Sequence, residues 1–247
     1  MPEGITYIGC AGWSLPRDAQ PAFALEGSHL QRYASRLNAV EINSSFHRPH
    51  NRATYERWAG AVPADFRFCV KLPRTITHDM RLIDAGSLLD EFLAQAGGLG
   101  TRLGCLLVQL PPSLEFQTGI ARAFFDALQA RHPGAVALEP RHASWFTPAV
   151  DGLLAQRCVS RVLADPVRHD PGRVPGGWPD RIYLRLHGTP RMYYSSYEPQ
   201  VLQALARRIA LAQREGREVW CMFDNTAGSQ AAHNAVDLEF ALDAQVQ

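Results

Sequence analysis

The chain has 247 residues, of which 46% are hydrophobic and 20% are charged, and its formal net charge is +1 at pH 7. This length is enough for one large core, and we predict a single domain over residues 1–247. The composition is that of an ordinary globular protein, and the balanced charge excludes a general attraction to nucleic acid or to an anionic membrane.

Targeting signals and disulfides are not expected. The first residues lack a basic segment followed by an apolar run, and no stretch of about 18 apolar residues predicts a membrane span. The five cysteines are widely spaced, with no Cys-x-x-Cys pair among Cys10, Cys69, Cys105, Cys158 and Cys221. We therefore predict reduced, mostly buried cysteines in a cytoplasmic protein, and no zinc site built from them.

Strands and helices alternate from one end of the chain to the other. The predicted strands are Tyr7–Gly12, Ala39–Ser44, Phe66–Leu72, Cys105–Leu110, the stretch from Val136 to Glu139, Arg161–Asp165, Arg181–His187 and Glu218–Asp224. The predicted helices lie at Leu30–Leu37, Thr54–Ala61, from Leu88 to near Gly97, Ile120–Arg131, Val150–Leu154, Pro199–Gly216 and Asn234–Ala244. Ser28 and Gln31 have the spacing of a capping box before the first helix. The segment Pro171–Pro179 is rich in proline and glycine, and we predict no regular structure there.

This alternation predicts an α/β fold, a parallel (β/α)8 barrel of the TIM type. Side chains alternate along a strand, so one strand face packs on the helices and the other points inward. The inward face ends in a polar residue on seven of the eight strands: Glu41 and Asn43, Lys71, Gln109, Glu139 and Arg141, Asp165, Arg185 and His187, and Asp224. A doubly wound open sheet is the alternative, but it would gather such residues at one switch point and not on nearly every strand.

The strand ends carry a family pattern in addition to polar residues. The matching segments are Ile8–Ser14, Val40–Phe46, Phe66–Lys71, Ile76–His78, Gln109–Ser113, Leu138–Trp145, Leu184–Gly188 and Phe223–Thr226. With these segments in this order, the chain resembles the domain of unknown function 72 family, the YecE-like barrels. The resemblance implies a TIM-type barrel and supplies no reaction. His47 stands where the family more often has tyrosine, and the loop after Trp13 is shorter than in many relatives.

A barrel enzyme carries its active site at the carboxyl ends of the strands. The catalytic candidates there are Glu139, His187, Glu41 and Asp165. Glu139 is the candidate general acid or base, because burial and neighbouring charges shift carboxyl pKa values. Glu41 and Glu139 are alternatively a glycosidase-type pair, which their separation would decide. A divalent metal is a third alternative, with candidate ligands Glu139, Asp165, His187 and Asp224, although no His-x-His or His-Glu-x-x-His spacing supports it.

Cationic, amide and aromatic side chains complete the predicted site at the carboxyl ends of the strands. Arginine offers a two-pronged donor and lysine a point charge, so these side chains suit a phosphate or a carboxylate, or alternatively neutralise the four carboxylates in an internal salt network. The substrate-binding candidates are Lys71, Arg141, Arg185, Asn43, Gln109, His78, Trp13, Asn225 and Tyr194. The loops after the last two strands, which begin at Gly188 and Asn225, occupy positions that often bind phosphate in this fold.

We expect an enzyme, a hydrolase or lyase, that acts on a polar, anionic small molecule such as a sugar phosphate or a nucleotide. The sequence requires no cofactor, and a divalent metal stays open. One alternative is a non-catalytic barrel that binds an anionic metabolite or a protein. Another is a metal-dependent, endonuclease-like phosphodiesterase, although the small net charge does not favour nucleic acid as a partner. A membrane partner is not expected.

Overall fold

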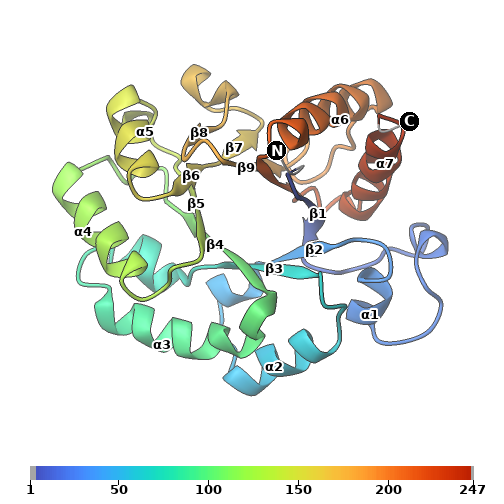
Figure 1. Cartoon of the computed structure of the whole chain (residues 1–247), viewed down its shortest axis with the longest axis horizontal. Coiled ribbons are helices and arrows are strands. Elements are labelled where there is room, and N and C mark those ends of the chain that lie inside the picture. The colour runs from blue at the N-terminus through green and yellow to red at the C-terminus, as the bar shows by residue number, and fades with distance from the viewer. Residues whose placement is uncertain (1–3, 246–247) are drawn as a thin grey trace.

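Strands and helices alternate through the computed structural model, which describes residues 4–245 (Figure 1). The strands are β1 (Thr6–Ala11), β2 (Ala39–Ile42), β3 (Arg67–Lys71), β4 (Leu103–Gln109), β5 (Ala135–Glu139), β6 (Val159–Arg161), β7 (Leu163–Asp165), β8 (Gly176–Gly177), β9 (Arg181–Leu186) and β10 (Glu218–Phe223). The α-helices are α1 (His29–Tyr33), α2 (Arg52–Gly60), α3 (Gly86–Ala96), α4 (Thr118–Gln129), α5 (Pro148–Ala155), α6 (Pro199–Arg214) and α7 (Ala231–Asp243). The α/β class is confirmed, and most predicted elements are present with ends shifted by a few residues.

All strands belong to one sheet, which is parallel except for β8 and is nearly closed. Its order is β7-β9-β10-β1-β2-β3-β4-β5-β6-β8. Neighbouring strands of the main run follow each other in sequence, so the order has no reversal and the doubly wound alternative is excluded. β6 pairs with β5, and β7 pairs with β9, with only Val162 between β6 and β7. The chain therefore changes its pairing partner at this one residue, from β5 before it to β9 after it.

Two predictions for this part of the chain were wrong. The strand Arg161–Asp165 is instead two short strands, because β6 is bound to one neighbour and β7 to another. The stretch Pro171–Pro179 is ordered: it includes the end of a 3-10 helix, η6 (Asp170–Arg173), and β8, which pairs antiparallel with β6. A Cβ atom on Gly177 would lie 2.4 Å from the Val159 carbonyl oxygen, so only a glycine lets this backbone approach β6 so closely.

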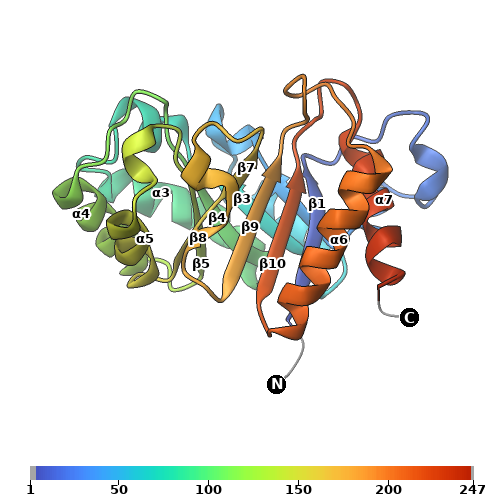
Figure 2. The ribbon, with the colours of Figure 1, turned by 90° about the horizontal axis from the view of Figure 1, so that it is seen from above.

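The two faces of the strands pack in different cores. Outward side chains and the helices form the larger core, including Val40, Phe68, Leu138 and Leu184. A smaller core fills the inside of the sheet, made of Ala39, Cys69, Cys105, Leu107, Ala137, Val162, Tyr183, Trp220 and Met222. The predicted alternation of faces is confirmed. The inner core ends below the carboxyl ends of the strands, where the polar residues begin. Figure 2 shows β9, β10 and β1 side by side, with α6 packed beside β10.

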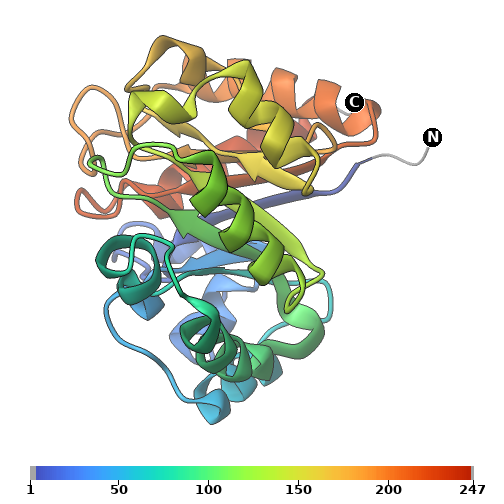
Figure 3. The ribbon, with the colours of Figure 1, turned by 90° about the vertical axis from the view of Figure 1, so that its left-hand side faces the viewer.

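The helices surround the sheet unevenly. α4 and α5 cover it on one side (Figure 3), and α6 and α7 pack against each other on another. Between α5 and α6 the connection from β7 to β9 contains only η6 and β8. An apolar groove lies there between the sheet and α6, lined by side chains that include Leu163, Ile182, Leu184, Val201 and Leu205.

Two further predictions concern membranes and disulfides. Within residues 4–245, no helix has both the length and the apolar character to cross a membrane. All five cysteines are free thiols; four are buried and Cys158 is exposed. The prediction of unpaired, mostly buried cysteines is therefore confirmed.

Tyr33→Phe tests a buried link between β1 and β2. The Tyr33 hydroxyl, at the end of α1, accepts a hydrogen bond from the Cys10 N–H and donates one to the Ala39 carbonyl, both at 2.8 Å. Because the variant leaves a buried N–H without a partner, we expect the free energy of unfolding to fall by about 1–3 kcal/mol in urea titration.

Tyr7→Phe is the matched control. The Tyr7 hydroxyl has no hydrogen-bond partner in the described part of the chain, and its side chain is only half-buried. We expect this variant to change stability by less than about 0.5 kcal/mol. Equal losses in the two variants would contradict the role given to the Tyr33 hydroxyl.

Candidate functional site

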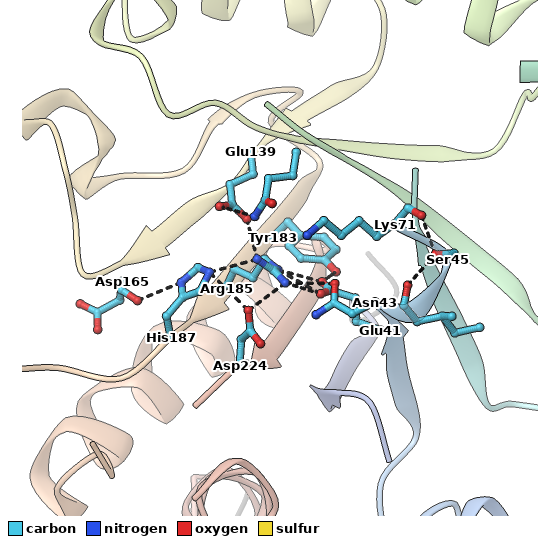
Figure 4. A network of polar contacts seen from close by, with 12 residues as sticks. Glu41, Asn43, Ser45, Lys71, Glu139, Asp165, Tyr183, Arg185, His187 and Asp224 are labelled. Carbon is cyan, nitrogen blue, oxygen red and sulfur yellow. Dashed lines mark hydrogen bonds and ion pairs between the residues drawn. The ribbon is translucent and has the colours of Figure 1, made fainter. Parts of the chain in front are cut away.

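The carboxyl ends of the strands bring a cluster of charged side chains together inside the sheet (Figure 4). We call it the strand-end cluster, and its members are Glu41, Lys71, Glu139, Arg185, His187 and Asp224. Each has 8% or less of its surface exposed. Charges buried to this degree are tolerated only when they are paired and hydrogen-bonded, so their partners decide what each group can do.

Arg185, on β9, lies at the centre of the cluster. Its Nε and Nη2 atoms contact Glu41, with Nη2–Oε1 at 2.5 Å, and Nη2 also lies 2.9 Å from Asp224 Oδ2. Its Nη1 donates to Glu139 Oε2 at 2.9 Å and to His187 Nε2 at 3.0 Å. These contacts use all five N–H donors of the guanidinium. Arg185 is therefore saturated and has no donor left for a ligand.

Glu41, on β2, accepts hydrogen bonds from Tyr183 and Asn43 in addition to those from Arg185. Its Oε2 accepts a hydrogen bond from the Tyr183 hydroxyl at 2.9 Å, two positions before Arg185 on β9. The Asn43 amide bridges the pair when its nitrogen faces Glu41 Oε1 (3.1 Å) and its oxygen faces Arg185 Nη2 (3.2 Å). Both carboxylate oxygens are thus occupied. Glu41 is built as a structural counter-ion of Arg185.

Glu139, at the end of β5, is also fully occupied. Gln109 Nε2 and Arg141 Nε both donate to its Oε1, at 3.0 Å and 3.1 Å, while Arg185 takes Oε2. Burial by itself would raise the pKa of Glu139, but the positive charges around it, Arg185 foremost and then His187, Arg141 and Lys71, hold that pKa well below its usual range. Glu139 is therefore a permanent carboxylate at neutral pH.

His187 and Asp224 share the remaining side of Arg185. His187 Nδ1 lies 3.1 Å from the Asp165 carbonyl oxygen, which can only accept, so Nδ1 carries the proton and the neutral ring's Nε2 accepts from Arg185. Burial lowers the pKa of His187. Burial also raises the pKa of Asp224, whose Oδ2 lies 3.5 Å from His187 Nε2. In this corner of the cluster, Asp224 is therefore the carboxylate with the raised pKa, and it lies beside a neutral imidazole.

Asp165, a predicted catalytic residue, contributes only its backbone to the cluster. Its carboxylate accepts hydrogen bonds at Oδ2 from Thr189 Oγ1 (2.5 Å) and from the Tyr197 hydroxyl (2.6 Å). Figure 4 shows the carboxylate turned away from Arg185. These bonds fix the loop that follows β9. Asp165 therefore orients His187 and the loop and does not face the other catalytic candidates.

Lys71, at the end of β3, differs from every other charged member of the cluster. Its side chain extends from β3 toward the cluster (Figure 4), yet within residues 4–245 its ammonium has no hydrogen bond and no ion pair. The Nζ atom lies 4.1 Å from the centre of the Phe46 ring. Burial lowers the pKa of Lys71 to about 8; Arg185 acts in the same direction, and Glu41, Glu139 and Asp224 oppose them.

Arg141 and His78 form the more exposed wall next to Lys71. Arg141 uses Nε on Glu139, and neither of its terminal nitrogens has a partner in the described chain. His78 lies in a short π-helix, η3 (Thr75–Asp79), with its ring against the Phe46 ring and its Nδ1 2.9 Å from Thr77 Oγ1. Burial lowers the pKa of His78 to about 4, helped by Lys71 and Arg74, so the ring is neutral at physiological pH.

The other predicted binding residues are not part of the cluster. Trp13 packs edge-on against Trp58 and the outer core. Asn225 is fully buried and donates to the Ser195 carbonyl and to Asn234 Oδ1, so it fixes the loop after β10. Tyr194 is exposed, with the Arg191 guanidinium 4.0 Å above its ring. Gln109 and Asn43, by contrast, belong to the network around Arg185.

The candidate metal ligands are not arranged around a common point. Among residues 4–245, no three or more His, Cys, Asp or Glu side chains are placed to hold a metal ion. The carboxylates of Glu139 and Asp224 both face the Arg185 guanidinium, which sits where a cation would. The donor set therefore does not fit a divalent metal, and we derive no step through one.

Tyr183 and Ser45 are parts of the site that the sequence did not single out. Tyr183 shares the inward face of β9 with Arg185, so the alternation of that strand was the signal. Ser45 Oγ donates to the carbonyls of Ile42 (3.0 Å) and Lys71 (2.7 Å), and so ties the ends of β2 and β3 together. No local pattern marks this serine, because its partner is on another strand.

Comparisons with known proteins agree with this architecture. The family model described as "Protein of unknown function DUF72" matches residues 7–247. UPF0759 protein YecE of Escherichia coli (strain K12) is 32% identical over 165 residues, which are 64% of this chain and only 58% of YecE. UPF0759 protein YunF of Bacillus subtilis (strain 168) is 24% identical over 96% of this chain and 94% of YunF. A crystal structure of a DUF72 family protein from Enterococcus faecalis V583 has a TM-score of 0.79 at 20% identity, covering 97% of this chain and 96% of that chain.

Arg185→Met tests whether the guanidinium holds the cluster together. The variant leaves three buried carboxylates without their main partner, and we expect the free energy of unfolding to fall by about 3–5 kcal/mol at pH 7. Removal of the Arg185 charge raises the folded-state pKa values of Glu139 and Asp224, because fewer cations then oppose the effect of burial. Their protonation then favours the folded state at lower pH, so the loss in urea titration should be smaller at pH 5 than at pH 7.

Arg52→Met is the control for the change of side chain. The Arg52–Glu56 pair lies on the surface of α2, with both side chains more than half exposed. We expect less than about 1 kcal/mol of destabilisation and little dependence on pH. A similar loss in both variants would show that Arg185 has no special structural role.

Proposed function

The chain belongs to the DUF72 family of proteins of unknown function, and from the geometry of its strand-end cluster we propose that it is an enzyme, a hydrolase or lyase, acting on a polar, anionic small molecule. A sugar phosphate or a nucleotide would fit this description. The proposed site is the carboxyl end of the sheet, beside Lys71 and Arg141. For this purpose we treat β6 and β7 as one interrupted strand of an eightfold TIM-type barrel.

The observation that supports this proposal is that some buried charged groups have protein partners for all their hydrogen bonds and others do not. Glu41, Glu139 and Arg185 have their charged groups filled by protein partners. Within residues 4–245, Lys71 and the terminal nitrogens of Arg141 have no such partners, although Lys71 is buried and Arg141 is partly buried. The unfilled donors are thus cationic, and both lie near enough to Glu139 and His78 to lower the pKa values of these groups, which favours a phosphate or carboxylate group as the ligand.

The proposed roles follow from these contacts. Arg141 binds the anionic group with its two terminal nitrogens, while its Nε stays on Glu139. Glu139 orients Arg141 and does not itself exchange protons, because its pKa is held well below neutral. Lys71 takes the role of acid or base that the sequence suggested for Glu139, since a pKa of about 8 allows both protonation states near neutral pH.

A binding experiment with inorganic phosphate tests the anion site. We expect phosphate to raise the melting temperature of the protein in a saturable way. Arg141→Ala should weaken the apparent affinity by roughly 10- to 100-fold, which corresponds to the loss of charge-assisted hydrogen bonds worth about 1.5–3 kcal/mol. Isothermal titration calorimetry at constant ionic strength gives the affinities directly.

Arg131→Ala is the control for loss of a positive charge. Arg131 follows α4 and pairs with Asp90 on α3, and in the described chain it has no hydrogen bond or ion pair with a member of the strand-end cluster. Its replacement should leave phosphate affinity unchanged. If phosphate does not bind, or if both variants weaken it equally, the anion site is refuted. Binding without turnover in a screen of phosphate esters and phosphorylated sugars would instead favour a non-catalytic binding barrel.

A further inference from the structure

Lys71 is the only lysine in the chain. The sequence has 25 Lys and Arg residues in total, and the other 24 are arginine. Arginine therefore supplies the surface charge and the buried ion pairs, including Arg185 and Arg161. An arginine side chain does not lose its proton in proteins, whereas a lysine amine does when it is buried. The one position whose side chain carries an amine is the cation of the strand-end cluster that has no ion pair within residues 4–245.

The surroundings of Lys71 are those of a reactive amine and not of a structural counter-ion. A structural lysine at this depth would pair with a carboxylate, yet Glu41 and Glu139 are occupied by Arg185, Tyr183, Gln109 and Arg141. The end of β3 is nevertheless held firmly, because Ser45 Oγ and the N–H groups of its neighbours fix the backbone. A rigid backbone thus presents a free amine beside an anion-binding arginine.

Burial of Lys71, helped by the charge of Arg185, increases the share of neutral amine. The Nζ atom lies 4.1 Å from the centre of the Phe46 ring, whose face attracts the ammonium form, so this contact positions Nζ and does not add to the share of neutral amine. Burial and the Arg185 guanidinium both disfavour the ammonium form. With a pKa of about 8, roughly a tenth of the molecules carry the free amine at pH 7, compared with less than about a thousandth for an exposed lysine. Only the neutral form has the lone pair that attacks an electrophile.

We propose that Lys71 forms an imine with the carbonyl carbon of an anionic aldehyde or ketone, whose phosphate or carboxylate group is held by Arg141. This inference rests on the proposed anion site and names the substrate class for it. The Nζ lone pair forms a C–N bond while the carbon–oxygen double bond opens, and the oxygen takes up a proton. The oxygen then leaves as water, which carries away the equivalent of the two amine protons, and a C=N bond remains. No oxidant or reductant is consumed.

Reductive trapping tests the imine on the full chain. The protein is incubated at pH 7 with glyoxylate and sodium cyanoborohydride, which converts an imine into a stable carboxymethyl amine. Intact-mass and peptide analysis locate the adduct, and the α-amine of the chain is the only other primary amine. We expect modification of Lys71 at least about 10-fold faster than that of Nα-acetyl-lysine amide under the same conditions. A rate equal to that of the free amino acid derivative would overturn the proposal.

Two further measurements separate this inference from the anion site. Formaldehyde, a carbonyl without an anionic group, tests the amine alone, and Arg141→Ala should slow trapping of glyoxylate at least about 5-fold more than that of formaldehyde. Lys71→Arg keeps the positive charge and must give no adduct at position 71, which checks the assignment. If phosphate binds through Arg141 but neither carbonyl modifies Lys71 rapidly, the imine fails and the anion site stands. If Lys71 traps both carbonyls rapidly but neither phosphate binding nor glyoxylate trapping depends on Arg141, the anion site fails.

Discussion

The buried guanidinium of Arg185 is the interaction on which the rest of the strand-end cluster depends. A charge in this position is tolerated only if every N–H finds an acceptor, and three carboxylates and one imidazole provide them. Those acceptors come from β2, β5 and the segments after β9 and β10. The guanidinium therefore ties opposite walls of the nearly closed sheet together at the end where the apolar inner core stops.

This saturation divides the site into charged groups whose hydrogen-bonding capacity is used up and charged groups with capacity left over. Groups whose hydrogen-bonding capacity is used up, such as Glu41, Glu139 and Arg185, define positions and charges but exchange nothing. Lys71 and Arg141 have hydrogen-bonding capacity left over, and the fixed groups beside them restrict their positions. The carboxylate of Glu139 links the two sets of groups, because it accepts one hydrogen bond from Arg185, whose donors are all used, and one from Arg141, whose terminal nitrogens are not.

The same division explains how ionisable groups so close together can differ in pKa. Glu139 is kept charged by several cations, whereas Asp224, at the edge of the same guanidinium, is dominated by burial. Lys71 is near the same carboxylates but pairs with none of them, so burial and Arg185 prevail. Glu139 and Asp224 both lie 2.9 Å from Arg185, so the number of further cations around each acid, and not its distance to the central charge, separates a permanent anion from an acid with a raised pKa.

The sequence by itself determined the α/β class, the order of strands and helices, the inward and outward faces of the strands, and which residues end the inward faces. These features follow from local periodicity, which hydrophobic spacing records directly. Only the tertiary structure decided which of those residues are free. Asp165 turns away because Thr189 and Tyr197 bind it, the strand breaks at Val162 because β6 and β7 pair with different neighbours, and Lys71 is unpaired because arginines fill the carboxylates. Each outcome depends on partners distant in sequence, so no local pattern could record it.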